Sequence, residues 1–469
     1  MAISKHSHGV RAFDKPYTYL FALLGILIPI TVQEAIAIKG DFITQSPVGP
    51  TVKDSLLKAD FVFKGLEFPS SMAFIGPDDI LVAEKNTGTV RRVTNGAMLS
   101  EPLLDVNVAN KGERGMLGIA VANNETNLQT YVFLYYTETA DGDGTDTPQG
   151  DNIVCGCLYR YQLLNNTLVN PKLLLMLNIN PPSESKIPAH LGGKVVIGPD
   201  KNVYISIGDV GGRLTQAIQG KGPPDGTGGI LVMTQDGAPV NRILGNQFPA
   251  YFYYAYGIRN SFGMDFDPLT GKLWDTENGG EFADEINLVE PGFNSGWNRV
   301  QGIWEHGVPS QNNYLPENIT LNPTNLADFN GIGSYIAPKF IWYHPVGPTA
   351  LKFMDSDKLG IQYENDIFVS DFHRGSIYNF NLSVSRLDLA LTGPLKDGIA
   401  NNDNERRETI FAEGFGGVTD MQIGPDGYLY VLSLYLGGDE CLPQSPDLPC
   451  VKYDSSNPGS IFRISPAYP

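Results

Sequence analysis

The 469-residue sequence lacks most of the residues and motifs on which common enzyme classes depend. It has only six histidines and four cysteines, and no HExxH or closely spaced histidine pair, which disfavours a histidine-based metal centre. It contains no GxSxG elbow, GxGxxG loop or GxxxxGK[ST] loop, so the motifs of serine hydrolases, Rossmann dehydrogenases and P-loop NTPases are missing. Hydride or acyl chemistry would therefore need another carrier.

Positive charge is also scarce. Lys and Arg number 33 against 51 Asp and Glu, which gives a net charge of −18. Because binding to nucleic acid needs a basic face, we expect no nucleic acid partner. Apolar residues make up 42% of the chain, enough for a substantial core.

No long segment shows the spacing of an amphipathic helix; a short unit of a turn followed by two strands recurs instead. Such turns occur at Gly76-Pro77-Asp78, Gly198-Pro199-Asp200, Asp267-Pro268 and Gly424-Pro425-Asp426-Gly427. Proline fixes φ, aspartate caps the turn and glycine allows positive φ. The recurrence predicts an all-β, six-bladed β-propeller with long inter-strand loops on the ligand face. A two-sheet sandwich array is the alternative, but it does not explain the recurring turn.

Three segments are expected to be the long loops: Asp141–Asn152, Gly220–Gly229 and Gln311–Asn330. In a propeller such insertions gather around the axial channel, where ligands bind.

The N-terminus predicts export. Basic residues precede an apolar run over residues 17–32, and a small-x-small cleavage site follows at residues 35–37. We expect residues 1–38 to be a signal peptide or an N-terminal membrane anchor, and residues 39–469 to be a single propeller domain outside the cytoplasm. Any membrane attachment would be through the N-terminal segment alone.

The four cysteines are consistent with an oxidising compartment. Cys441 and Cys450 flank a proline-rich loop, where a disulfide is plausible. For Cys155-Gly-Cys157, a bridge across one residue and two buried thiols both remain open. The spacing does not match a zinc site.

The residues that could carry chemistry gather between Tyr256 and Trp297. Arg259 offers a planar cationic fork suited to a carboxylate or quinone oxygen. The turn at Asn278-Gly279-Gly280 lets the backbone approach a ligand closely. Asp284 and Glu285 supply the hard oxygen ligands that Ca²⁺ prefers, although a solvated acidic turn would have the same residues.

His190 is a candidate general base. It precedes Gly192-Gly193 and the strand pattern KVVIGPD, and its ordinary pKa lies near neutrality. A histidine bonded to a loop carbonyl is the alternative.

From about Phe61 to Ile464 the chain resembles the soluble PQQ-dependent glucose and aldose sugar dehydrogenases, a family that includes the sorbosone dehydrogenases. The resemblance is most specific at HLGGKVVIGPDKNVYISIGD and at Tyr256–Trp297. It implies a six-bladed propeller that binds PQQ and Ca²⁺ and oxidises the C1 hydroxyl of an aldose to a lactone. The partners it implies are a small-molecule sugar and an external electron acceptor.

The same resemblance implies roles for single residues. His190 matches the base that removes the hydroxyl proton. The residues matched to the cofactor site are Arg259, Asn260, Asn278, Glu113, Thr349, His373 and Arg374. The residues matched to the Ca²⁺ site are Gly279, Gly280 and Glu285.

The chain departs from the glucose dehydrogenases at several cofactor positions. Those enzymes carry Arg-x-Arg-Asp before the last GPDG turn, where this chain reads Gly417-Val418-Thr419-Asp420. His373 replaces a lysine, and Glu113 replaces a neutral glutamine. Two alternatives to the dehydrogenase stay open: a PQQ-less propeller that binds a protein or glycan, and a Ca²⁺-dependent propeller lactonase.

Overall fold

The computed structural model describes residues 49–124, 128–139, 146–147, 153–180, 189–212, 223–240, 242–280, 282–303, 325–434 and 458–468. The chain divides into two units, Met1–Ser46 and Pro47–Pro469, and all the described residues belong to the second. The predicted leader at residues 1–38 and the Cys441–Cys450 pair lie outside the described residues. Most of the expected loops Asp141–Asn152 and Gln311–Asn330, and the start of Gly220–Gly229, lie outside them too.

Helix is almost absent from the described part of the chain. Its helical segments are α1 (Asp403–Glu408) and the 3-10 turns η1 (Ala250–Phe252), η3 (Ile361–Tyr363) and η4 (Gly393–Asp397). None of the helices found there is long and apolar enough to cross a membrane.

The strands of the described residues form six sheets. The first holds β3 (Pro69–Gly76), β4 (Asp79–Glu84), β5 (Thr89–Thr94), β6 (Ala97–Met98) and β7 (Leu104–Asp105). The second holds β8 (Met116–Asn124), β9 (Gln129–Thr139), β10 (Ile153–Leu164) and β11 (Thr167–Leu177). The third holds β12 (Val195–Ile197), β13 (Val203–Ile207), β14 (Gly229–Met233), β15 (Tyr253–Tyr256), β19 (Phe293–Asn294) and β20 (Ser334–Tyr335).

The remaining three sheets follow in chain order. The fourth holds β16 (Ser261–Phe266), β17 (Leu273–Glu277), β18 (Asp284–Val289), β21 (Phe340–Trp342) and β25 (Ile399–Ala400). The fifth holds β22 (Pro348–Phe353), β23 (Ile367–Asp371), β24 (Ile377–Phe380), β26 (Ile410–Glu413) and β1 (Thr51–Val52). The sixth holds β27 (Val418–Ile423), β28 (Leu429–Ser433), β29 (Gly459–Pro466) and β2 (Leu57–Leu66).

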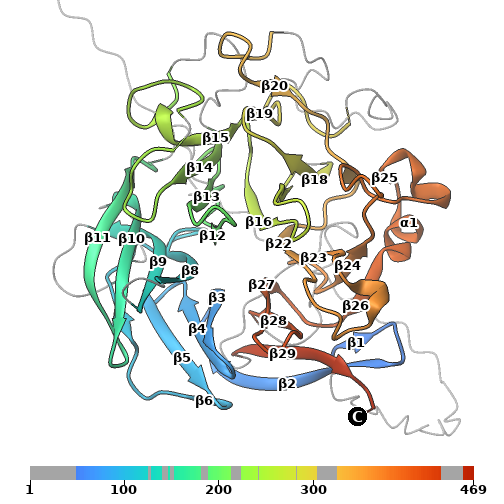
Figure 1. Ribbon diagram of the computed structural model, residues 1–469, viewed down its shortest axis with the longest axis horizontal. Coiled ribbons are helices and arrows are strands. Elements are labelled where there is room, and N and C mark those ends of the chain that lie inside the picture. The colour runs from blue at the N-terminus through green and yellow to red at the C-terminus, as the bar shows by residue number, and fades with distance from the viewer. Residues whose placement is uncertain are drawn as a thin grey trace, which may run out of the picture. The chain divides into compact units, whose positions relative to one another are not determined.

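The sheets are arranged in a ring around a central axis (Figure 1). Their first strands β3, β8, β12, β16, β22 and β27 line the axis, and each contacts the first strand of the next sheet. An apolar cluster fills each junction between neighbouring sheets; for example, Trp274 of the fourth sheet and Tyr378 of the fifth belong to one cluster. Because each sheet buries both faces against its neighbours, the ring has a continuous core. The predicted all-β propeller is confirmed.

The recurring proline-aspartate turn has the same place in four sheets. It joins the innermost strand to the second strand: β3 to β4, β12 to β13, β16 to β17 and β27 to β28. Since these pairs are antiparallel, the start of each innermost strand lies beside the end of the second strand. One end of the ring therefore collects residues from both strands of every hairpin.

The two ends of the described chain close the ring. β2 pairs with β29 in antiparallel register, with Leu57 opposite Pro466 and Leu66 opposite Gly459. The last sheet is thus built from the final three strands and one strand from the beginning of the propeller unit. The aromatic ring of Phe462 on β29 packs against those of Phe61 and Phe415, with centroids 5.9 and 5.6 Å apart.

This closure should be a principal source of stability. Phe462 is 3% exposed, whereas its neighbour Phe61 is 57% exposed. We expect Phe462→Ala to lower the free energy of unfolding by about 3–5 kcal/mol, because it leaves a cavity between β29 and the fifth sheet. The matched change Phe61→Ala should cost less than about 1 kcal/mol. Urea unfolding measures both, and equal losses would contradict this account of the closure.

Candidate functional site

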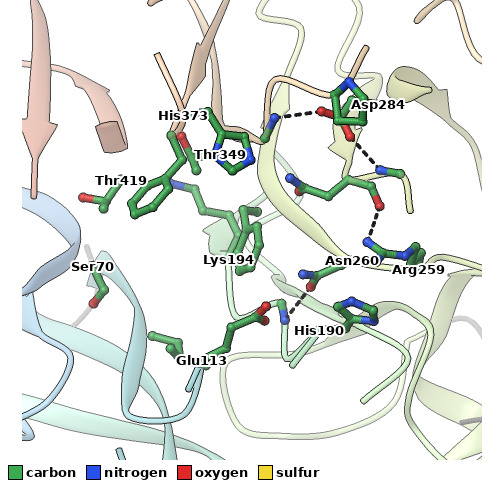
Figure 2. A pocket seen from close by; sticks show the side chains of 18 of the residues that line it. Ser70, Glu113, His190, Lys194, Arg259, Asn260, Asp284, Thr349, His373 and Thr419 are labelled. Atoms are coloured by element: carbon green, nitrogen blue, oxygen red, sulfur yellow. Dashed lines mark hydrogen bonds between the residues drawn. The ribbon is translucent and has the colours of Figure 1, made fainter. Parts of the chain in front are cut away.

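A cavity of about 1030 Å³ opens at the end of the ring where the hairpin ends meet. All six sheets contribute to its lining, through residues at the start of the innermost strands and the end of the second strands. Figure 2 shows how the labelled side chains surround it. The predicted site residues that line this cavity are Glu113, His190, Arg259, Asn260, Asn278, Gly279, Gly280, Thr349 and His373.

His190 is held by a buried aspartate. Its Nδ1 atom lies 2.6 Å from Oδ1 of Asp209, whose side chain is 0% exposed. The other carboxylate oxygen accepts a hydrogen bond of 2.7 Å from Nε1 of Trp297. A carboxylate at Nδ1 fixes the proton on that nitrogen and leaves Nε2 as an acceptor. The arrangement suits a general base whose free nitrogen faces a ligand.

The backbone at His190 is also constrained. Its φ is +59°, a region that few residues other than glycine adopt. The His190 carbonyl accepts a hydrogen bond from Val210 N at 3.1 Å, which fastens this loop to the end of β13. Such strain persists where the surrounding structure requires it, often at a functional site.

Arg259 lies between β15 and β16 and is oriented by the same network. Its guanidinium lies 5.3 Å from the ring of Trp297, and Nη1 donates to the carbonyl of Asn278 at 2.9 Å. Its Nε is buried and has no hydrogen-bond partner among the residues that the structure describes. Trp297 therefore links the group that orients His190 to a cation with an unused donor.

Asn260 and Asn278 fasten two neighbouring loops. Asn260 Oδ1 accepts from Gly192 N at 3.0 Å, close to His190 in sequence, and its carbonyl accepts from Asn278 N at 2.8 Å. A Cβ atom on Gly279 would lie 2.2 Å from the carbonyl oxygen of Phe282, so only glycine fits this turn.

Asp284 ties that turn to the next sheet. Its buried carboxylate accepts from Gly279 N at 2.7 Å, Val346 N at 2.7 Å and Gly347 N at 2.8 Å. Burial raises its pKa to about 6, while the three N–H donors oppose that shift. Figure 2 shows two of these contacts on the upper wall of the cavity.

Glu285 does not line the cavity, in contrast to the glycines with which it is predicted to share a metal. Successive side chains of a strand point to opposite faces, so Glu285 faces away from the side that Asp284 occupies. There it accepts from Gly302 N at 2.7 Å and lies opposite Glu277 of β17. Burial raises its pKa to about 7, and burial together with Glu285 raises the pKa of Glu277.

Arg374 also lies away from the cavity lining. Its guanidinium is 3.5 Å from Asp403 in α1, and its backbone N–H donates to Asp371. The neighbouring His373 does line the cavity, and its Nδ1 is buried without a partner. Burial and the nearby Arg374 lower the pKa of His373, so the imidazole is neutral at pH 7.

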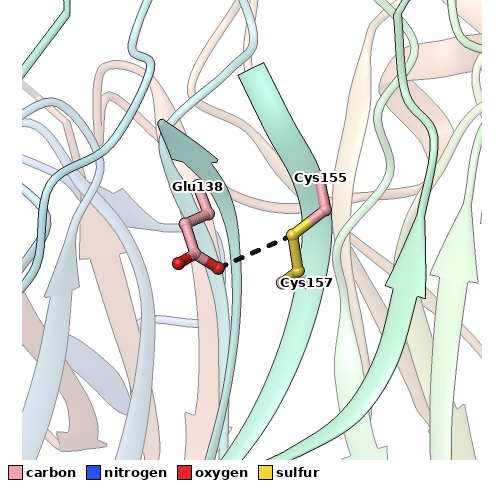
Figure 3. Close-up of side chains that lie close together, drawn as sticks. All are labelled: Glu138, Cys155 and Cys157. Carbon is pink, nitrogen blue, oxygen red and sulfur yellow. Dashed lines mark hydrogen bonds between the residues drawn. A yellow bond between two sulfur atoms is a disulfide. The ribbon is translucent and has the colours of Figure 1, made fainter. Parts of the chain in front are cut away.

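A second cluster lies on β9 and β10, away from the cavity lining (Figure 3). A disulfide joins Cys155 to Cys157, whose Cα atoms are 5.4 Å apart. Oε2 of Glu138 lies 3.6 Å from Cys155 Sγ and accepts from the Tyr159 hydroxyl at 2.8 Å. Sulfur atoms that are bonded to each other are not thiolate ligands, so this cluster is not a metal centre in the described state.

The site also contains residues that motif reasoning missed, chiefly Asp209, Trp297 and Lys194. A signal for Asp209 was present, because it ends the strand pattern NVYISIGD of the His190 hairpin. In that hairpin Val195 lies opposite Ile205, and continuing the register outward places residue 190 beside residue 210. Trp297 lies 88 residues after Asp209, so the register of a single hairpin could not have predicted their contact.

A family model described as Glucose / Sorbosone dehydrogenase matches residues 66–438. An aldose sugar dehydrogenase of Escherichia coli is 25% identical over 389 residues, which cover 81% of this chain and 91% of that protein. Quinoprotein glucose dehydrogenase B of Acinetobacter calcoaceticus is 28% identical over 273 residues, 54% of this chain and 55% of that protein. The crystal structure of the soluble aldose sugar dehydrogenase from Escherichia coli shares the fold, with a TM-score of 0.63 and 20% identity. The match covers 87% of this chain and 99% of that one.

The buried Glu285 predicts how stability depends on pH. Its pKa is raised from 4.5 to about 7 in the folded protein, which therefore holds a proton that the unfolded chain has lost in this interval. The free energy of unfolding should thus fall as the pH rises through that window, and Glu285→Gln should make the fall smaller. Urea unfolding at about pH 5 and pH 8 in a chelating buffer measures this. The exposed Glu364→Gln is the control; an unchanged pH dependence in Glu285→Gln would contradict the assignment.

Proposed function

This chain belongs to the glucose/sorbosone dehydrogenase family, and we propose that it is an exported, PQQ- and Ca²⁺-dependent dehydrogenase that oxidises the C1 hydroxyl of aldose sugars to lactones. The observation that carries the proposal is the His190–Asp209 pair, which presents a base to a cavity that also holds Arg259. The names of two relatives, an aldose sugar dehydrogenase and a quinoprotein glucose dehydrogenase, support it.

The cavity fits PQQ in size and in donor chemistry. PQQ has three carboxylates and two quinone oxygens, all of which accept hydrogen bonds. The lining offers two buried donors without partners, Arg259 Nε and His373 Nδ1. Arg259, Asn260, Asn278, Thr349 and His373 are the residues that would hold the cofactor. Arg374, which the resemblance also implies, would need to move from its contact with Asp403.

The turn at Gly279-Gly280 fits a Ca²⁺ ion. Gly279 and Gly280 line the cavity, and backbone carbonyl oxygens are ligands that Ca²⁺ prefers. Glu285, which the resemblance matches to the same ion, faces the other side of β18 beside Glu277 and would need to move to reach it. Bound Ca²⁺ would supply a positive charge that polarises a quinone oxygen.

The proton chemistry can be derived from the protein itself. Asp209 holds the Nδ1 proton of His190, so Nε2 is free to accept the proton of the sugar C1 hydroxyl. The buried carboxylate then stabilises the imidazolium that forms. PQQ, when bound, supplies the quinone that accepts the C1 hydride. Arg259, fixed by Trp297 and the Asn278 carbonyl, orients the reacting groups.

Apolar side chains make the cavity suitable for this chemistry. Phe68, Phe262 and Phe372 are part of its lining. Aromatic walls exclude water and strengthen the electrostatic interactions of the polar groups between them.

Further parts of the proposal concern the whole chain. We propose that each of the six sheets is one blade and that the enzyme works outside the cytoplasm, with any membrane attachment confined to residues 1–38. Because the two electrons taken from the sugar must leave the reduced cofactor, the enzyme also needs an external electron acceptor.

Reconstitution tests the function directly. Apo protein is mixed with PQQ and Ca²⁺, and both the absorbance of bound quinone and dye reduction with a panel of aldoses are measured. We expect sugar-dependent turnover that His190→Ala lowers by about 10²- to 10⁴-fold, the range for loss of a general base. PQQ should still bind to this variant, because His190 acts on the sugar.

Failure to bind PQQ at micromolar concentrations would overturn the dehydrogenase proposal. The missing Arg-x-Arg pair would then favour a PQQ-less propeller that binds a protein or glycan. Binding of PQQ without turnover of any aldose would instead overturn the substrate assignment.

Asp209 should act through His190. In Asp209→Asn the amide can donate to Nδ1, which places the histidine proton on Nε2 and removes the acceptor. We expect kcat to fall by about 10²-fold or more. KM should change little, because Asp209 does not line the cavity and the residues that would contact the sugar are unaltered. The control is Asp200→Asn, which changes an exposed aspartate at the turn of the same hairpin. Normal kcat in Asp209→Asn would show that Asp209 does not set the tautomer.

A further inference from the structure

Among the described residues, the start of β27 brings no cation to the cavity wall. Thr419, which lines the cavity, stands at the position of the second arginine of the Arg-x-Arg pair. His373, on the adjacent wall, is kept neutral by its lowered pKa. A carboxylate of an anionic cofactor placed against this wall would therefore need a cation from another element.

Lys194 brings a cation to this wall from across the ring. It lies immediately before β12, and its Nζ reaches to 2.5 Å from Oδ1 of Asp420, the residue after Thr419. Figure 2 shows the Lys194 side chain extending toward the wall that holds Thr419. Lys194 is 7% exposed and Asp420 1%, yet both line the cavity. Burying an ammonium group costs free energy unless it is paired, so the ion pair with Asp420 holds the Lys194 ammonium at this position.

Asp420 and Lys194 are not an exclusive pair, because Asp420 accepts hydrogen bonds from several other groups. Its carboxylate also accepts from Ser71 Oγ at 2.9 Å, Met72 N at 2.9 Å, Met421 N at 2.8 Å and Gln422 Nε2 at 3.3 Å. An ammonium has three donors, and among the described residues one hydrogen bond accounts for only one of them. The other two are available to a ligand in the cavity.

We propose that Lys194 is the cation of the carboxylate subsite of the cofactor, in place of the absent Arg-x-Arg pair, and that Asp420 is its positioning residue. The inference rests on the proposed function, since it concerns how this chain holds PQQ. The alternative is that Lys194 and Asp420 only brace the third sheet against the sixth and the first.

A comparison of two ligands separates these alternatives. The dissociation constants of apo protein for PQQ and for PQQ trimethyl ester, which lacks the three negative charges, are measured by fluorescence titration. Lys194→Met should weaken the binding of PQQ about 10- to 100-fold, the loss of one charged hydrogen bond, and leave the binding of the ester unchanged. Lys194→Arg should restore most of the affinity. Lys358→Met, a change at an exposed lysine, is the matched control.

Asp420→Asn gives a test of opposite sign. It removes the negative charge beside Nζ but keeps a side-chain oxygen that can accept from Nζ, so Lys194 stays in place and PQQ should bind several-fold more tightly. Equal losses for PQQ and its ester in Lys194→Met, or no loss for either, would overturn the inference, as would weaker PQQ binding in Asp420→Asn. If wild-type protein binds neither ligand, the proposed function fails and this inference fails with it. If wild-type protein binds PQQ, the Lys194 and Asp420 variants test this inference alone.

Discussion

The antiparallel pairing of the two innermost strands of each sheet is the constraint on which the site depends. A tight turn joins the strands at one end of the ring, so the open ends of the hairpins meet at the other. Side chains nineteen residues apart, such as those of His190 and Asp209, lie side by side just beyond the paired strands β12 and β13. The pairing of β12 with β13 therefore brings the two residues together, and the hydrogen bond from Val210 N holds the loop that carries His190.

Three buried aspartates organise the cavity, and each is satisfied by several donors. Asp209 holds His190 and Trp297, Asp284 joins the Gly279 turn to the fifth sheet, and Asp420 joins β27 to β3 and to Lys194. A buried carboxylate costs free energy unless it is hydrogen-bonded, so each one specifies the relative position of the elements that it joins. These three carboxylates therefore serve mainly to fix structure, and the buried donors left without partners among the described residues belong to Arg259 and His373.

The sequence predicted the propeller because the physics of its unit is local. Proline, aspartate and glycine fix the turns, and alternating aromatic and β-branched residues fix the strands, as at residues 424–433. The cavity-lining residues were predicted where a motif carried them, as for His190 and Arg259. The role of Glu285 at a metal stays a prediction: the motif contains two adjacent acids, and the pleat of β18 places Asp284, not Glu285, at the cavity. Lys194 and Trp297 could not be predicted, since the partner of Lys194 comes from the sixth sheet and the partner of Trp297 lies 88 residues away in the sequence.

The pairing of β2 with β29 has a consequence for biogenesis. A ribosome that has made the first five sheets has not yet made the strand on which β2 must lie, so the ring stays open until β29 has been made. Until then two strand edges present unpaired N–H and C=O groups, the kind of surface that promotes aggregation. A chain that is translocated before it folds avoids this hazard, because β2 and β29 then reach the same compartment before either strand pairs with anything else. A nascent chain that stops short of residue 459 leaves β2 without its partner and cannot complete the circle.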